Sequence, residues 1–284
     1  MGCSEEASAK ADEGRILDVV RGLHAQGALK ALYVSSPRQL SGITGLNTLA
    51  IWEKYPARIK IFRRKEGEVN LFIIAVDGRL FEKDVKEAFL GEVVAAWLLA
   101  PYKELVGGGY LWKHEVSFKR RKVEEALTGL ALEYPHLSAE LLIDPRYFVF
   151  ENLRRIIQIY PPISSIYLDF EGKEPEREIA SSMIGYREAI RELAETGSLH
   201  IRNDYVVLDR GFVEATVKRR FRAINFLSMI DKSLRPFIIR SFIEVAELLN
   251  FHLEREPQHS SSLIEERRVR NIENPKRFLH LPTA

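Results

Sequence analysis

Residues Val69–Val76, VNLFIIAV, most limit how this chain can fold, because nearly every residue among them is apolar. An apolar run of this length is typical of a strand that is buried on both faces of a sheet. The preceding segment, Arg58–Phe62, alternates charged and apolar residues, which predicts a strand with one apolar face. Lys65–Glu68 is expected to form the turn between the two strands, and Asp77-Gly78 to end the second. The sequence therefore predicts a sheet with a buried central strand.

The surrounding segments predict helices packed on this small sheet. A helix is expected over Arg15–Gln26, where apolar residues recur at helical spacing, and another strand over Ala31–Val34. Residues 36–58 are expected to form a long loop. Further helices are expected at Phe81–Ala96, ended by Pro101, at Glu115–Tyr134 and at Pro145–Ile159. The predicted fold class is α/β, a small mixed sheet with a helical extension.

The second half of the chain predicts a mainly α-helical domain. Helical residues are expected over Glu176–Glu195, with Gly185 as a candidate break between two helices. Leu199–Ile201 and Tyr205–Leu208 predict a β-hairpin around a three-residue turn at 202–204. Helix, helix and hairpin is the element order of a winged-helix module. Two more helices are expected, at 212–230 and 236–251.

A boundary between two domains is predicted at Pro161-Pro162 and the polar stretch Glu171–Pro175. The expected organisation is a disordered tail at 1–13, an α/β domain with a helical extension at 14–160, a winged-helix-like domain at 174–253 and an extended charged tail at 254–284.

The net charge of the chain is too close to zero for it to bind nucleic acid through its overall charge. The 284 residues include 42 Lys and Arg against 40 Asp and Glu, a formal charge of +2, so such a role depends on local patches. The one cysteine, Cys3, excludes a disulfide framework and a cysteine-based zinc site. No apolar run approaches the roughly 20 residues that span a bilayer. No signal peptide opens the sequence, and a cytoplasmic protein without a membrane partner is expected.

The order of elements over residues 14–105 resembles the nucleotidyltransferase fold of the DNA polymerase β-like superfamily, especially the small predicted nucleotidyltransferases of archaea. In that family the first strand ends in Gly-Ser, the second carries Asp-x-Asp and the third carries one more Asp. These carboxylates hold two divalent metals. Here Ser35-Ser36 stands at the first position, Arg58 and Lys60 at the second, and Asn70 at the third. Because cations repel Mg²⁺, the resemblance implies a degenerate domain that has lost its metal site. A different α/β domain is the alternative.

An active enzyme would need other carboxylates, and Asp77, Glu82 and Asp84 are the candidates for catalysis. In that case Mg²⁺ is the expected cofactor; otherwise none is expected. Asp77 also suits an ordinary turn, and Glu82 and Asp84 also suit the start of a helix, where negative charge complements the helix dipole. The glycines at 107–109 lack the Lys-Ser/Thr of a P-loop, and no histidine pair has metal-ligand spacing.

Two basic patches are the candidates for binding phosphate or nucleic acid. The first is Arg58, Lys60 and Arg64, which are expected on one face of a strand. A row of cations can hold phosphate groups. The alternative is the solvated face of an edge strand, where lysine discourages aggregation.

The second patch is Lys218, Arg222 and Asn225, which are spaced as one stripe along a helix. Seven cations and two carboxylates between Phe212 and Arg240 give this region a local charge of +5. The alternative is a solvated helix face, or one paired with acidic residues elsewhere in the fold.

The sequence therefore predicts a nucleotidyltransferase-like protein, catalytically degenerate, that binds RNA or DNA or has a regulatory role. An active metal-dependent nucleotidyltransferase that uses the unaligned carboxylates is one alternative, and a protein-interaction scaffold without nucleic acid is another. Near the end of the chain, Phe278 and Leu281 have no later apolar partner. We expect this segment to dock as a short extended strand or to contact a partner protein.

Overall fold

The computed structural model describes residues 2–35, 38–40, 43–66, 69–159, 175–218 and 274–282. The chain forms two compact units. The first comprises Met1–Phe89 and Ala100–Glu115, and the second comprises Leu90–Leu99 and Val116–Ala284. The predicted boundary at Pro161-Pro162 lies outside the described residues.

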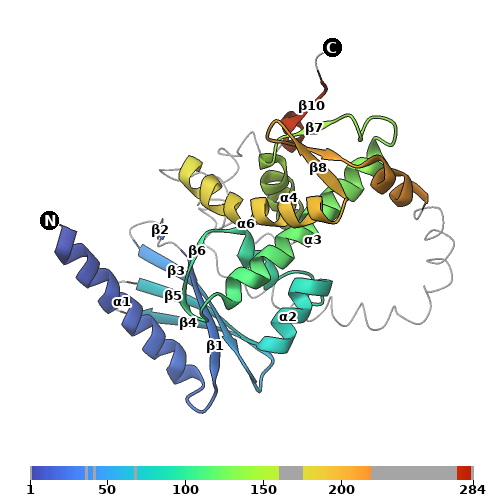
Figure 1. The fold of residues 1–284 in the computed structure, drawn as a ribbon. Coiled ribbons are helices and arrows are strands. Elements are labelled where there is room, and N and C mark those ends of the chain that lie inside the picture. The colour runs from blue at the N-terminus through green and yellow to red at the C-terminus, as the bar shows by residue number, and fades with distance from the viewer. Residues whose placement is uncertain are drawn as a thin grey trace. The chain divides into compact units, whose positions relative to one another are not determined.

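The first unit is built on a six-stranded mixed sheet, so the predicted α/β class is confirmed (Figure 1). Its strands are β1 (Leu29–Ser35), β2 (Arg38–Leu40), β3 (Ile43–Trp52), β4 (Ile59–Glu66), β5 (Val69–Asp77) and β6 (Tyr102–Val106). They lie in the order β4-β5-β3-β1-β6, and β2 pairs with β3. β5 runs parallel to β3, whereas the β4–β5, β1–β3 and β1–β6 pairs are antiparallel. The apolar run of β5 thus lies between two other strands, as its composition predicts.

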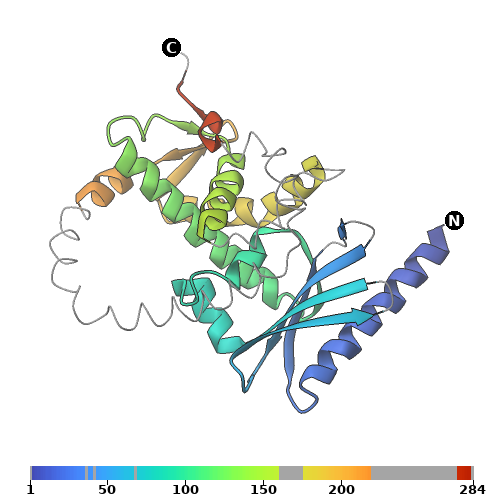
Figure 2. The ribbon, with the colours of Figure 1, turned by 180° about the vertical axis from the view of Figure 1, so that it is seen from behind.

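Helix α1 (Gly2–Leu23) packs on one face of this sheet (Figure 2). Ile16 and Val20 on the helix share a buried core with alternate residues of the strands, among them Leu32, Ala50 and Ile73. Side chains alternate along a strand, so intervening residues such as Tyr33, Leu49 and Ile74 lie on the other side. We call these two sides the α1 face and the opposite face.

Several helices begin or end at residues other than those that the sequence predicts. α1 begins at Gly2, across residues that were expected to form a tail, and ends at Leu23. α2 spans only Gly78–Glu87, because its C-cap residue, Ala88, adopts a left-handed conformation with φ of 53°. The buried apolar residues that follow form a 3₁₀ helix, η1 (Ala95–Leu99). Among the described residues, no helix combines the length and apolarity needed to cross a membrane.

The second unit combines helices with a four-stranded sheet. Its elements are the greater part of α3 (Tyr110–Glu133), β7 (Leu142–Ile143), α4 (Arg146–Ile159), α6 (Pro175–Glu195), β8 (Leu199–Arg202), β9 (Tyr205–Leu208), η3 (Pro275–Phe278) and β10 (Leu279–His280). The strand order is β10-β7-β9-β8. The pairing of β10 with β7 confirms that the end of the chain docks as a short strand.

The predicted hairpin is present, but two details of this region are wrong in the prediction. The turn contains two residues, Asn203 and Asp204, whose φ values of 49° and 66° are those of a tight hairpin turn. α6 also continues through Gly185 as one helix. Residues 210–218 are helical, but the rest of 212–230 and all of 236–251 lie outside the described residues. The winged-helix assignment therefore stays a prediction.

Three strands of the first unit, β2, β3 and β6, were not predicted, and β2 lies within the expected loop at 36–58. β3 occupies much of the same loop, and β6 follows Pro101. In β3 the polar residues Thr44, Asn47 and Thr48 interrupt the apolar pattern, and Gly45 is unfavourable within a strand. Pairing with β1 and β5 outweighs these weak local preferences.

Candidate functional site

The positions mapped onto the nucleotidyltransferase motif do not converge. Arg58 precedes β4 and has a left-handed φ of 62°. Lys60 pairs with Ala75, whereas Asn70 pairs with Lys65 near the other end of β4. Five positions along a strand separate Lys60 and Lys65 by about 16 Å. Arg58 lies outside the strand. The expectation that it shares one strand face with Lys60 and Arg64 is therefore wrong for Arg58.

The strand that follows β1 in the sheet is β3, whereas the motif positions Arg58 and Lys60 were assigned to the segment of β4. At the end of β1, the Ser35 hydroxyl accepts a hydrogen bond from the Asn47 backbone N–H of β3 at 3.0 Å. β3 contains no carboxylate, so it supplies none of the acidic ligands that hold the two metals in the motif. Ser36 lies outside the described residues. Within the described ranges, no group of three or more His, Cys, Asp or Glu side chains is placed to hold a metal ion.

Asp77, a candidate for catalysis, caps helix α2. One carboxylate oxygen accepts hydrogen bonds from the backbone N–H groups of Arg79 at 3.0 Å and Leu80 at 3.4 Å. The other accepts one from the Tyr55 N–H at 3.1 Å. Three backbone donors thus engage this side chain, and an aspartate is favoured at a helix N-cap for this reason.

Glu82, the second candidate, lies in a polar cluster of the first unit. Its carboxylate accepts hydrogen bonds from Lys30 Nζ at 2.8 Å and Tyr110 OH at 3.0 Å. The Lys30 hydrogen bond lowers the pKa of Glu82, and the Tyr110 hydrogen bond also lowers it, against the effect of partial burial. Burial, followed by the hydrogen bond to Glu82, raises the pKa of Tyr110. Asp84 is fully buried in α2.

His114 borders this cluster and is buried. Its ring contacts Tyr110 and Phe81, with centroid separations of 4.4 and 5.4 Å. Burial lowers the pKa of His114, although the negative charge of Glu82 opposes the shift. Sequence reasoning missed Lys30, Tyr110 and His114, because no local motif links them to Glu82.

The glycine run at 107–109 leads into helix α3. All three glycines have positive φ, and the N–H groups of Gly109 and Leu111 donate to the Glu104 carboxylate at 3.0 and 3.1 Å. An internal carboxylate thus already binds the N–H groups that a phosphate would use at a helix N-terminus.

Strand β4 carries the first predicted basic patch and forms an edge of the sheet. Lys60, Arg63, Arg64 and Lys65 are all exposed. None of them forms an ion pair with a carboxylate that the structure describes. Lys60 and Arg64 lie over the ring of Phe62, and Arg63 lies over that of Phe72, at 5.1, 5.9 and 6.0 Å from the centroids.

The second predicted patch falls largely outside the described residues. Lys218 is exposed and lies 3.6 Å from Glu214, one helical turn earlier. Arg222 and Asn225 are not among the described residues. The proposed stripe on this helix therefore stays a prediction.

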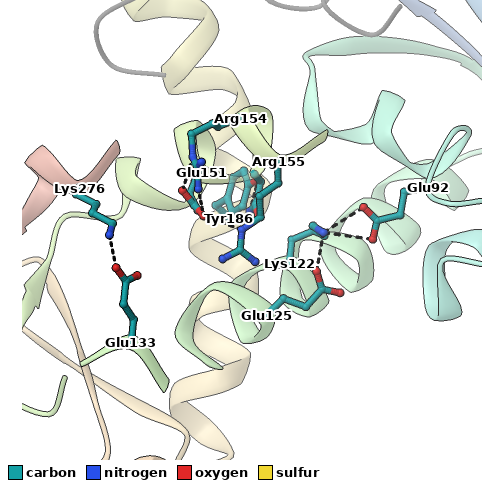
Figure 3. A network of polar contacts seen from close by, with 10 residues as sticks. Glu92, Lys122, Glu125, Glu133, Glu151, Arg154, Arg155, Tyr186 and Lys276 are labelled. Carbon is teal, nitrogen blue, oxygen red and sulfur yellow. Dashed lines mark hydrogen bonds and ion pairs between the residues drawn. The ribbon is translucent and has the colours of Figure 1, made fainter. Parts of the chain in front are cut away.

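The second unit contains a network of charged side chains that form ion pairs with one another (Figure 3). Buried Lys122 lies 3.1 Å from Glu92, and buried Glu151 lies 2.6 Å from Arg155. A cleft of about 260 Å³ is lined by Glu133, Glu151, Arg154, Arg155 and Lys276, with other residues of α3, α4 and the C-terminal segment. Arg154 and Arg155 pair with Glu151, and Lys276 pairs with Glu133.

Comparisons with known proteins do not assign the chain to a family. No family model matches it, and no curated protein does. One solved structure with similarity to it is a nucleotidyltransferase-like protein from Exiguobacterium sibiricum 255-15, which is 11% identical in sequence. The match covers 66% of this chain and 77% of that chain, with a TM-score of 0.31. A TM-score of this size does not establish a shared fold.

Proposed function

We propose that this chain is a catalytically degenerate, nucleotidyltransferase-like protein that binds nucleic acid through the basic strand β4. The observation that carries the proposal is the set of exposed cations on this strand without a described carboxylate partner. Cations that are paired internally contribute little to a partner's binding, whereas unpaired ones attract phosphates and release counterions. The near-neutral overall charge makes this local concentration of positive charge distinctive.

The aromatic rings beneath these cations also support the proposal. Phe62 and Phe72 lie within about 6 Å of three of the four charged groups. Cations interleaved with aromatic rings are a common surface for nucleic acid, because phosphates pair with the charges and bases stack on the rings.

The test measures binding of the full chain to single-stranded RNA, single-stranded DNA, transfer RNA and duplex DNA across a range of salt concentrations. Replacing Lys60, Arg63 and Arg64 with alanine should weaken binding. It should also reduce the slope of log affinity against log salt by about 2 for a single strand. A matched control replaces three exposed cations of α2, Arg79, Lys83 and Lys86. The proposal would be contradicted if the two triple variants lost the same amount of affinity, or if the wild-type chain did not bind at low salt.

The alternative of an active nucleotidyltransferase makes a different prediction. Such an enzyme should transfer nucleotide in the presence of Mg²⁺ or Mn²⁺, and the D77N and D84N variants should abolish the transfer. The degenerate protein should show no metal-dependent transfer while still binding nucleic acid. Transfer by the wild-type chain that persists in the β4 triple variant would favour the active enzyme.

A further inference from the structure

The basic residues of β4 divide between the two faces of the sheet. By alternation, Lys60, Phe62 and Arg64 lie on one face, and Arg63 and Lys65 lie on the other. The ring contacts agree with this division, because Lys60 and Arg64 both lie over Phe62, whereas Arg63 lies over Phe72 of β5. The two halves of the basic patch therefore have different surroundings.

The half that contains Phe62 lies on the α1 face. Phe62 is half-buried and packs against the core that Ile16 and Val20 of α1 form with the strands. This face can offer charge to a ligand, but its aromatic ring belongs to the core beneath α1.

The opposite face carries two rows of polar and aromatic residues across three neighbouring strands. In the first row, the register places Arg63 beside Phe72, and Phe72 beside Asn47. The second row contains Lys65 beside Asn70, and Asn70 beside Gly45. Residues paired in this way on adjacent strands lie on the same face, roughly 5 Å apart. A ligand on this face would therefore meet cations, an aromatic ring and amides together.

These two rows are accessible. Arg63, Lys65 and Asn70 are exposed, and Phe72 and Asn47 are half-buried. At Gly45 an added Cβ atom would meet none of the described atoms within 4 Å, so these residues leave room at this end of the second row. The combination suits a flat base lying on a ring, with its phosphates at the edge strand.

We propose that these two rows, Arg63–Phe72–Asn47 and Lys65–Asn70–Gly45, form a binding site for single-stranded nucleic acid. Phe72 stacks on a base, Arg63 and Lys65 hold the flanking phosphates, and the amides of Asn70 and Asn47 meet base edges. A duplex is a poor ligand here, because the faces of its bases are hidden in the stack. This inference rests on the proposed function and names the class of nucleic acid that the basic strand selects.

The first test compares two double variants that remove equal charge from the same strand. R63A/K65A should weaken binding of a single-stranded 12-mer on the order of tenfold more than K60A/R64A. F72A should weaken it on the order of tenfold, and F72L should retain the fold while losing the stacking. Thermal unfolding of each variant verifies that the sheet remains intact. Parallel measurements with RNA, DNA and a duplex of the same sequence identify the preferred strand.

A fifth variant uses the space at Gly45. Because none of the described atoms obstructs its Cβ position, G45V should fold normally, yet its side chain should obstruct a base beside Asn70 and weaken single-strand binding. If R63A/K65A and K60A/R64A lost the same amount of affinity, the assignment to this face would be wrong, but the proposed function would still stand. Duplex affinity equal to single-strand affinity would also overturn it. Absence of any binding by the wild-type chain at low salt would remove the proposed function as well.

Discussion

Lys30 and Glu82 lie 52 positions apart in the sequence, yet Lys30 Nζ is 2.8 Å from Glu82 Oε1. The pair joins the start of β1 to helix α2 and is only partly buried. An ion pair of this exposure contributes little to stability. We expect E82Q to lower the free energy of unfolding by about 0.5–1 kcal/mol at neutral pH.

The Lys30–Glu82 ion pair should make the stability of the chain depend on pH. The lowered pKa of Glu82 means that its contribution is present above the ordinary glutamate pKa and is lost as pH falls through the folded-state pKa. The free energies of unfolding of the wild-type chain and E82Q, measured in urea, should therefore approach one another as the pH falls below the ordinary glutamate pKa of about 4.3. If the difference in the free energy of unfolding between the two proteins stayed constant from pH 7 to pH 3, this assignment would be contradicted.

His114 should make the first unit less stable in mild acid. Its pKa is lowered by burial, so the unfolded chain binds its proton more readily than the folded chain does. Stability then falls as pH drops below the ordinary histidine pKa of about 6.5. Lys30, Lys86 and Lys113 reinforce the shift, and Glu82 opposes it. The melting temperature should fall less between pH 7.5 and 5.5 in H114F, which keeps an aromatic ring at this site, than in the wild-type chain.

Asp77 should contribute to stability as a helix cap. D77A leaves three backbone N–H groups without their acceptor and should cost about 1–2 kcal/mol in urea unfolding. D77N keeps an acceptor oxygen and should cost less. If both variants unfold at the wild-type urea concentration, the cap does not support α2.

Phe278 fixes the C-terminal segment to the second unit. Its ring stacks on that of Phe150, with centroids 5.4 Å apart and planes at 7°, and both rings are buried. F278A should lower the free energy of unfolding of this unit by about 3 kcal/mol, and deletion of 272–284 should lower its melting temperature. The control is L281A, because the Leu281 side chain is 58% exposed. Equal melting temperatures for the two substitutions would show that the segment docks without Phe278.

The central strand could be predicted because its determinants are local. The apolar run at Val69–Val76 identifies β5 by itself, and Asp77-Gly78 marks its end. β3 could not be predicted in this way, since Gly45, Asn47 and Thr48 obscure its pattern and its partners provide the stability. Local turn chemistry also predicted the hairpin of β8 and β9, although not the length of its turn.

The candidate site could be predicted only in part. Alternation in the sequence identifies the charges of β4 and assigns Lys60 and Arg64 to one face. The neighbours of Arg63 depend on register, which the sequence does not specify: Phe72 is on the next strand and Asn47 is on the one beyond it. The same holds for the cluster around Glu82, which brings together residues of β1, α2 and α3.

The place of β10 in the small sheet determines when that sheet can be completed during synthesis. Its strands come from residues 142–143, 199–208 and 279–280, so the last of them is made well after the others. The first unit ends at Glu115. At typical translation rates the two events are separated by roughly 10–30 s, long enough for the first sheet to form while the edge of β7 still awaits its partner. Until β10 is made, the edge of β7 that faces away from β9 lacks its partner and is open to strands of neighbouring chains.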